Sequence, residues 1–197
     1  MASSGNSIHT LNLNTNLNLS ANPSGASHDH YLRNDYGYVH FTGVSVTPAQ
    51  FPGLHTLGMS FARADLSAVG GVNPPHYHPR ATKMAPVLAG RVYAGFVDTG
   101  GRLFAKFLVE GEVMVFPRGM VHFQLNVGDQ PATVYGTFNS DNPGIVRIPA
   151  TVFGSRIRDA VLERASGLTV EELRGIFPTL RRIEKRFGVP NKAELED

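Results

Sequence analysis

The chain has no cysteine among its 197 residues, so it forms no disulfide bond and carries out no thiol chemistry. It also lacks a strong excess of either charge: the formal net charge is +2, which is too small to indicate a nucleic-acid partner. No apolar run is long enough to cross a membrane. We therefore expect neither nucleic acid nor membrane among its partners.

The opening residues 1–6 contain neither the charged nor the apolar segment of a signal peptide. The chain is expected to be either cytoplasmic or a processed form of a secreted protein. With 42% hydrophobic residues it is long enough for one well-buried core. We divide it into a polar N-terminal extension over 1–34, a β-rich domain over 35–153 and a helical tail over 154–197.

The extension contains one periodic stretch. Leucines alternate with polar residues over 11–19, which indicates either an added strand at a sheet edge or a disordered leader. His28 and His30 are also separated by one residue, but they lie among Ser, Gly and Asp. That context favours a solvated loop over a metal site.

The middle of the chain consists of short β-rich runs separated by Gly and Pro. The predicted strands are 38–46, 55–62, 87–97, 103–109, 113–116, 121–125, 133–139 and 145–148. Such spacing with little helical periodicity is typical of an antiparallel sandwich or barrel, and a closed barrel leaves no exposed edge. Gly100 and Gly101 have the composition of a tight hairpin turn between two of these strands.

The pattern becomes helical after residue 153. Ser155 is expected to cap a helix that stops before Gly167. Thr169 and Glu172 have the spacing of a capping box and predict the start of a second helix. A last helix is expected over 179–188, with an apolar stripe along one face.

Two histidines separated by one residue dominate the functional argument. His76 and His78 lie on the same face of an extended segment because strand side chains alternate with a period of two. A third histidine, His122, falls in the predicted strand 121–125. Three imidazoles that converge inside a barrel make a metal site.

These segments resemble the double signature of the germin-like branch of the cupin superfamily. The first motif is matched at Gly70, His76, His78 and Gly90, with Lys83 in the place of a glutamate. The second is matched in full at Gly111, Pro117, Gly119, His122 and Asn126. The resemblance covers roughly residues 35–175. It implies an all-β fold, an antiparallel cupin (jelly-roll) β-barrel with C-terminal α-helices.

The resemblance also implies a manganese site, with His76, His78 and His122 as ligands beside the glutamate. Lys83 removes that hard oxygen donor and introduces a positive charge. At ~5 Å and an effective dielectric constant near 20, a unit charge opposes a divalent ion by roughly 7 kcal/mol. Burial pushes a lysine towards its neutral form, and a neutral amine can bind metal. The site is thus weakened rather than excluded: no cofactor is expected, with manganese or another divalent metal as the alternative.

Further residues of the two motifs are candidates for substrate binding at the mouth of the pocket. They are Tyr77, Arg80, Met84, Phe116, Met120, Phe123 and Asn126. Because strand side chains alternate between faces, half of the apolar ones are expected to be ordinary barrel core. For Arg80 and Asn126 we favour a structural role.

Three functions remain open. The main hypothesis is a metal-free enzyme in which Lys83, His76, His78 and His122 promote a cyclisation or isomerisation of a small organic molecule, such as a Diels–Alder-type step, by orientation and hydrogen bonding. The alternative is a manganese-dependent superoxide dismutase or oxalate oxidase that retains three histidines. The third is a non-catalytic storage or ligand-binding cupin.

The last expectation concerns assembly. In germin-like proteins the C-terminal helices clasp neighbouring subunits, and the resemblance implies the same for this tail. We therefore expect a homo-oligomer, a dimer or larger. The absence of cysteine departs from plant germins, which typically carry an amino-terminal disulfide.

Overall fold

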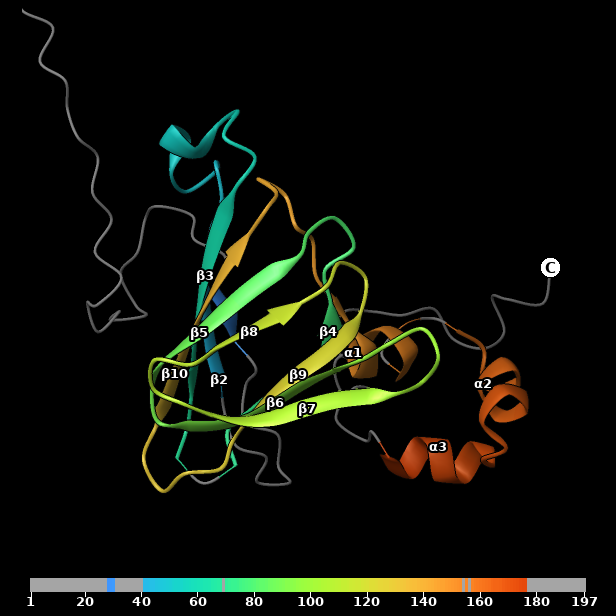
Figure 1. The fold of residues 1–197 in the computed structure, drawn as a ribbon. Helices are drawn as coiled ribbons and strands as arrows, with labels where there is room; N and C mark the ends of the chain where they lie inside the picture. The colour runs from blue at the N-terminus through green and yellow to red at the C-terminus, as the bar shows by residue number, and fades with distance from the viewer. Residues whose placement is uncertain (1–27, 31–40, 69, 154, 156, 177–197) are drawn as a thin grey trace, which may run out of the picture.

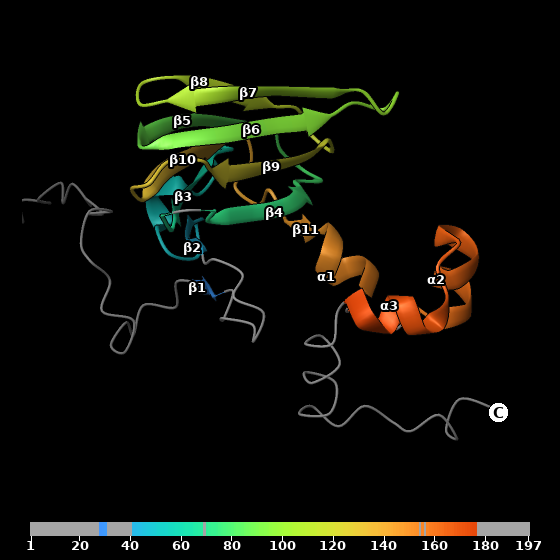
Figure 2. The ribbon, with the colours of Figure 1, turned by 90° about the horizontal axis from the view of Figure 1, so that it is seen from below.

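The computed structural model describes residues 28–30, 41–68, 70–153, 155 and 157–176, and its strands form two antiparallel sheets (Figures 1 and 2). The six-stranded sheet has the order β1 (His28–His30), β2 (Phe41–Val46), β3 (Ser60–Leu66), β10 (Ala132–Phe138), β5 (Lys83–Ala89), β8 (Val113–Phe116). The five-stranded sheet has the order β11 (Val146–Arg147), β4 (Val72–Tyr77), β9 (Val121–Asn126), β6 (Arg91–Val97), β7 (Leu103–Val109). The predicted all-β architecture with C-terminal α-helices is confirmed.

The core lies between the two sheets, on the side chains that alternate inwards. Strand β9 shows the alternation: His122, Gln124 and Asn126 are buried, and the residues between them are partly exposed. A cluster of buried apolar side chains packs in this interior. Its members are Ala64, Leu66, Ala85, Val87, Val92, Ala94, Leu108, Phe116, Ala132 and Val134. Through Phe116, which stacks on His122, the cluster adjoins the histidines.

Two turns shape the barrel. The predicted strand 87–97 is wrong as a single strand, because Gly90 divides it into β5 and β6. Gly90 has a φ of 83°, and a Cβ there would lie 2.6 Å from the Cβ of Ala132. The hairpin at 100–101 is confirmed: it joins β6 to β7, and the Asp98 carboxylate accepts a hydrogen bond from the backbone N–H of Gly100 at 2.9 Å.

Several boundaries differ from the sequence prediction. The strand expected over 55–62 begins only at Ser60, after the 3₁₀ helix η1 (Pro52–Leu54). His28–His30 forms the short strand β1, paired with β2, rather than a solvated loop. The alternating stretch 11–19 lies outside the described residues. The domain boundaries at 34/35 and 153/154 stay predictions.

The helical tail begins earlier than expected. Strand β11 has only two residues, and helix α1 (Ile148–Phe153) follows it directly. Helix α2 (Asp159–Ser166) starts after Arg158 rather than after Ser155, and helix α3 (Val170–Ile176) follows. Figure 2 shows α2 and α3 away from the sheets. None of the described helices combines the length and hydropathy needed to cross a bilayer.

The predicted helix signals between α2 and α3 are confirmed. Gly167 ends α2 in the left-handed region, where its N–H donates to the carbonyl of Glu163. Thr169 and Glu172 form the capping box: the Glu172 carboxylate accepts from the Thr169 N–H at 2.8 Å, and the Thr169 hydroxyl accepts from the Glu172 N–H at 3.2 Å. The helix expected over 179–188 lies outside the described residues.

Candidate metal centre

Three imidazoles meet inside the barrel as the motif spacing predicts. His76 lies on β4, His78 follows the end of that strand, and His122 lies on β9 directly opposite His76. One ring nitrogen from each lies within 4.8 Å of the others. All three side chains are buried, with exposed fractions of 1%, 6% and 1%. No other group of metal-capable side chains of this kind exists within the described part of the chain.

Backbone carbonyls fix the orientation of each ring. The Nδ1 atoms of His76, His78 and His122 lie 2.7, 2.5 and 2.9 Å from the carbonyl oxygens of Pro74, Gly144 and Met120, respectively. A carbonyl only accepts, so each Nδ1 carries the proton and each Nε2 keeps its lone pair. The Nε2 atoms of His78 and His122 are buried without a hydrogen-bond partner.

The histidines are neutral at physiological pH. Burial lowers the pKa of His78 to about 4 and that of His122 to about 2, and Lys83 contributes to both shifts. Burial, followed by His122, lowers the pKa of His76 well below its usual value. Neutral imidazoles are the form that binds metal ions. The two unpartnered Nε2 atoms, on rings held by carbonyls at Nδ1, therefore fit a divalent ion.

Lys83 faces the cluster from the opposite sheet. It is the first residue of β5, only 5% exposed, and its cross-strand neighbours are Phe116 on β8 and Phe138 on β10. Its Nζ lies 5.6 Å from the centre of the Phe116 ring. Burial lowers the pKa of Lys83 to about 8.

The two phenylalanines beside Lys83 also pack against the histidines. The ring of Phe116 stacks on His122 with centroids 4.4 Å apart, and the ring of Phe138 contacts His78 at 4.6 Å. The surroundings of the lysine are therefore aromatic on both sides. Phe116 was among the predicted pocket residues, whereas Phe138 was not.

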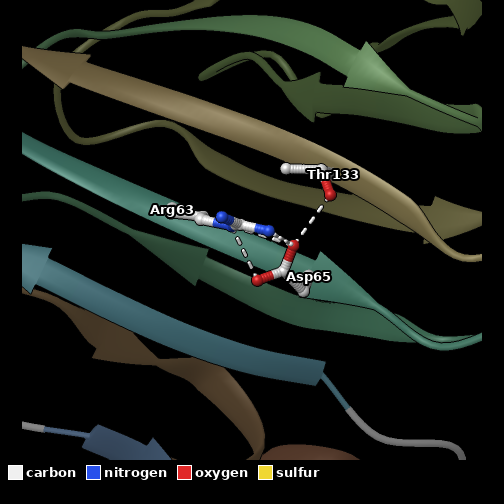
Figure 3. Close-up of polar contacts among 3 residues, drawn as sticks. All are labelled: Arg63, Asp65 and Thr133. Carbon is white, nitrogen blue, oxygen red and sulfur yellow. Dashed lines mark hydrogen bonds and ion pairs between the residues drawn. The ribbon is translucent and has the colours of Figure 1, made fainter. Parts of the chain in front are cut away.

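A cavity of about 200 Å³ opens beside His76, His78 and Lys83. Strands β2 and β3 and the loop 143–145 form its walls, and Arg63 and Arg147 also border it. Arg63 is ion-paired with Asp65 at 2.8 Å, and Asp65 also accepts a hydrogen bond from Thr133 (Figure 3). None of the described residues that line the cavity is acidic. The cavity thus presents cations and neutral imidazoles to a ligand.

An amide pair beside the histidines was missed at the sequence level. Asn73 donates through Nδ2 to Oε1 of Gln124 at 2.7 Å, and both side chains are buried. Asn73 Oδ1 and Gln124 Nε2 have no hydrogen-bond partner among the described residues. The strand alternation that placed His122 inwards also places Gln124 inwards, so that signal was present in the sequence.

Two of the predicted substrate-binding residues hold turns together. The buried Asn126 donates to the carbonyls of Ser67 and Gln130 and accepts from the N–H of Gly128. Arg80 donates to the backbone and side-chain oxygens of Asn142 at 2.6 Å. The latter contact fixes the loop whose Gly144 carbonyl accepts from His78.

The remaining candidates do not join the histidine cluster through their side chains. Met84 is 49% exposed, beside the inward-facing Lys83. Phe123 packs against Tyr93 on the outer side of β9, and Tyr77 alternates with the buried His76 and His78. Met120 contributes its backbone carbonyl to His122. A role for these side chains in substrate binding stays a prediction.

Comparisons with known proteins confirm the predicted cupin (jelly-roll) fold. The Cupin family model matches residues 27–174. Germin-like protein 2-4 of Oryza sativa subsp. japonica is 82% identical over 157 residues, which cover 80% of this chain and 66% of that protein. The chain therefore spans just under two thirds of the length of this relative.

Solved structures of oxalate oxidase also share the fold of this chain. They are 41% identical to this chain with a TM-score of 0.66, and the match covers 70% of this chain and 72% of theirs. One of them holds the substrate analogue glycolate.

The neutral histidines make the stability of the metal-free protein depend on pH. The unfolded chain protonates a histidine near pH 6.5, whereas the native chain keeps His78 neutral down to about pH 4. Between these values the unfolded state binds more protons. The free energy of unfolding should therefore fall as the pH is lowered, by up to about 1.4 kcal/mol per pH unit for each such histidine.

Urea titrations in the presence of a chelator between pH 7 and pH 5 test this expectation. His78→Gln should reduce the slope, because one of the histidines with a lowered pKa is removed. His55→Gln, at an exposed histidine, should leave the slope unchanged. A wild-type free energy of unfolding that stays constant over this range contradicts the expectation.

Proposed function

Because the chain belongs to the cupin family, and within it to the germin-like proteins, we propose that its three-histidine centre binds a divalent metal ion and serves an oxidoreductase activity on a small carboxylate. Manganese is the ion that the germin-like resemblance implies. The proposed residues that hold it are His76, His78 and His122. The observation that carries the proposal is the convergence of three neutral imidazoles, two of whose buried Nε2 atoms lack a partner.

A bound metal ion would supply Lewis-acid and one-electron chemistry at the histidine cluster. The protein's own contribution is to keep the imidazoles neutral and aimed, through the carbonyls of Pro74, Gly144 and Met120. The described lining of the cavity contains no acidic residue, and a bound divalent ion would add positive charge there. An anionic substrate is therefore favoured by charge, and a polar neutral one is not.

The similarity to oxalate oxidase makes a small dicarboxylate such as oxalate the substrate of choice for this proposal. The metal-free cyclase gains no support from the comparisons, and the metal-dependent alternative agrees better with them. The chain spans only part of the length of its relatives, so the oxidoreductase activity is itself part of the proposal.

Removal of one ligand tests the proposal. The wild-type protein should bind about one manganese ion per chain and show oxalate-dependent consumption of dioxygen that a chelator abolishes. His122→Ala should lower the affinity for manganese by at least about 100-fold, because it removes a third of the donor set. Elemental analysis after dialysis measures the bound metal, and an oxygen electrode measures the turnover.

The exposed His55→Gln serves as the matched control and should retain both properties. A folded wild-type protein that binds no divalent metal would refute the proposed metal centre. Metal binding without oxalate turnover would instead support the metal centre and refute oxalate as its substrate.

We also propose that the protein is a homo-oligomer. Three strands, β5, β7 and β8, expose large apolar side chains to solvent in the single chain. The most exposed of them are Met84, Leu88, Leu103, Phe104, Phe107, Val109, Val113 and Val115. Monomeric proteins rarely leave so much apolar surface uncovered, and a second copy of the chain would bury it.

Two charges on β8 test the oligomer. Val113 and Val115 are each 50% exposed and lie on the same face of the strand. The double variant Val113→Glu with Val115→Glu should shift the mass measured by light scattering at micromolar concentration towards that of one chain. Gln130→Glu serves as the control, because it also introduces a glutamate at an exposed position but lies outside β5, β7 and β8. It should leave the mass unchanged. A monomeric wild-type protein would contradict the proposal.

A further inference from the structure

The histidine cluster lacks an anion. Its metal-capable side chains are His76, His78 and His122, with no carboxylate among them in the described part of the chain. The buried side chain that faces them is instead Lys83, whose ammonium form would repel a metal ion. Three neutral nitrogen donors beside an ammonium group would hold a hard ion such as manganese only weakly, because such an ion prefers an anionic oxygen among its donors.

The surroundings of Lys83 favour an uncharged amine. The side chain is 5% exposed and lies between the aromatic residues Phe116 and Phe138, and it lacks an acidic partner in the described cavity lining. Burial without a counter-charge lowers the pKa of this amine to about 8. A substantial fraction of it therefore carries a free lone pair in a mildly alkaline solution. Such an amine is a nucleophile.

The Lys83 side chain also borders open space. Its methylenes pass over Gly136 on β10, where a Cβ would lie only 2.8 Å from Lys83 Cε. The absence of a side chain at Gly136 thus makes room for the lysine. Lys83, His76 and His78 border the same cavity of about 200 Å³, which is ample for a group of three heavy atoms.

We propose that Lys83 is a carbamylation site, and that its carbamate supplies the anionic oxygen ligand that the three histidines lack. The neutral Nζ attacks the carbon of carbon dioxide, an N–C bond forms, and one C=O electron pair moves onto oxygen. The nitrogen then loses a proton to solvent, which leaves an N-carboxylate with a charge of −1. No oxidant or reductant is required.

This inference rests on the proposed function, because the carbamate acquires its role by holding the metal ion. The modification reverses the sign of the charge that faces the histidines. It changes the donor set from three nitrogens to three nitrogens and an anionic oxygen, which suits a hard ion. Metal binding should in turn stabilise the carbamate, since each ligand favours the state that the other binds.

The first test measures metal affinity with and without carbon dioxide. Metal-free protein is titrated with manganese in degassed buffer and in buffer containing bicarbonate, and free manganese is followed by electron paramagnetic resonance. Bicarbonate should tighten binding by about tenfold or more. An affinity that does not depend on bicarbonate would overturn the inference and leave the proposed metal centre intact. Absence of metal binding in both buffers would overturn the proposed function and this inference together.

The second test identifies the bond. Protein labelled with ¹⁵N-lysine is incubated with ¹³C-bicarbonate and zinc, which is diamagnetic. A carbamate gives a ¹³C resonance split by one-bond coupling to ¹⁵N. A bound but unsplit bicarbonate signal, or no bound signal, would overturn the proposal. This measurement uses the wild-type protein and needs no variant to fold.

Three variants complete the design. Lys83→Met should abolish both the split resonance and the effect of bicarbonate, provided that its circular dichroism spectrum matches the wild type. Lys83→Glu carries its own carboxylate, so it should bind manganese tightly and equally well in both buffers. Lys106→Met is the matched control, because Lys106 is exposed and ion-paired with Glu112 at 2.6 Å. It should retain both wild-type responses, and loss of them in this control would overturn the assignment to Lys83.

Discussion

The pairing of β4 with β9 places His76 opposite His122, and the rest of the site depends on this contact. Three imidazoles are buried together without a counter-charge, which is tolerated because each Nδ1–H donates to a backbone carbonyl and each ring stays neutral. The carbonyl for His78 belongs to Gly144, in a loop that Arg80 and Asn142 hold in place. Arg80, which does not line the cavity, thereby helps to orient His78.

The opposite sheet contributes a buried lysine where a metal centre calls for a negative charge. Lys83 lies opposite Phe116 and Phe138 on the neighbouring strands, and the described lining of its cavity contains no acidic residue. Its charge state therefore decides what the cavity can bind. As an ammonium it favours anions and opposes cations, and as a modified or neutral group it permits a metal ion.

The sequence was sufficient to predict the parts of the structure that follow a local rule. The period of two placed His76, His78 and His122 inwards, and the Thr169 and Glu172 spacing located a helix start. The sequence did not predict the features that depend on tertiary contacts. Gly90 interrupts a continuous apolar run because it packs against Ala132, and the Gly144 carbonyl meets His78 only through the folded loop. Phe138 reaches the site by cross-strand register, which a single sequence does not display.

We propose that these three histidines form one metal centre. Crystals of the protein grown with manganese and bicarbonate, measured at the manganese absorption edge, would locate the ion. One strong anomalous peak per chain is expected, about 2 Å from the Nε2 atoms of His76, His78 and His122. An anomalous map with no peak among these imidazoles, or with its peak elsewhere on the protein, would rule out the proposed centre.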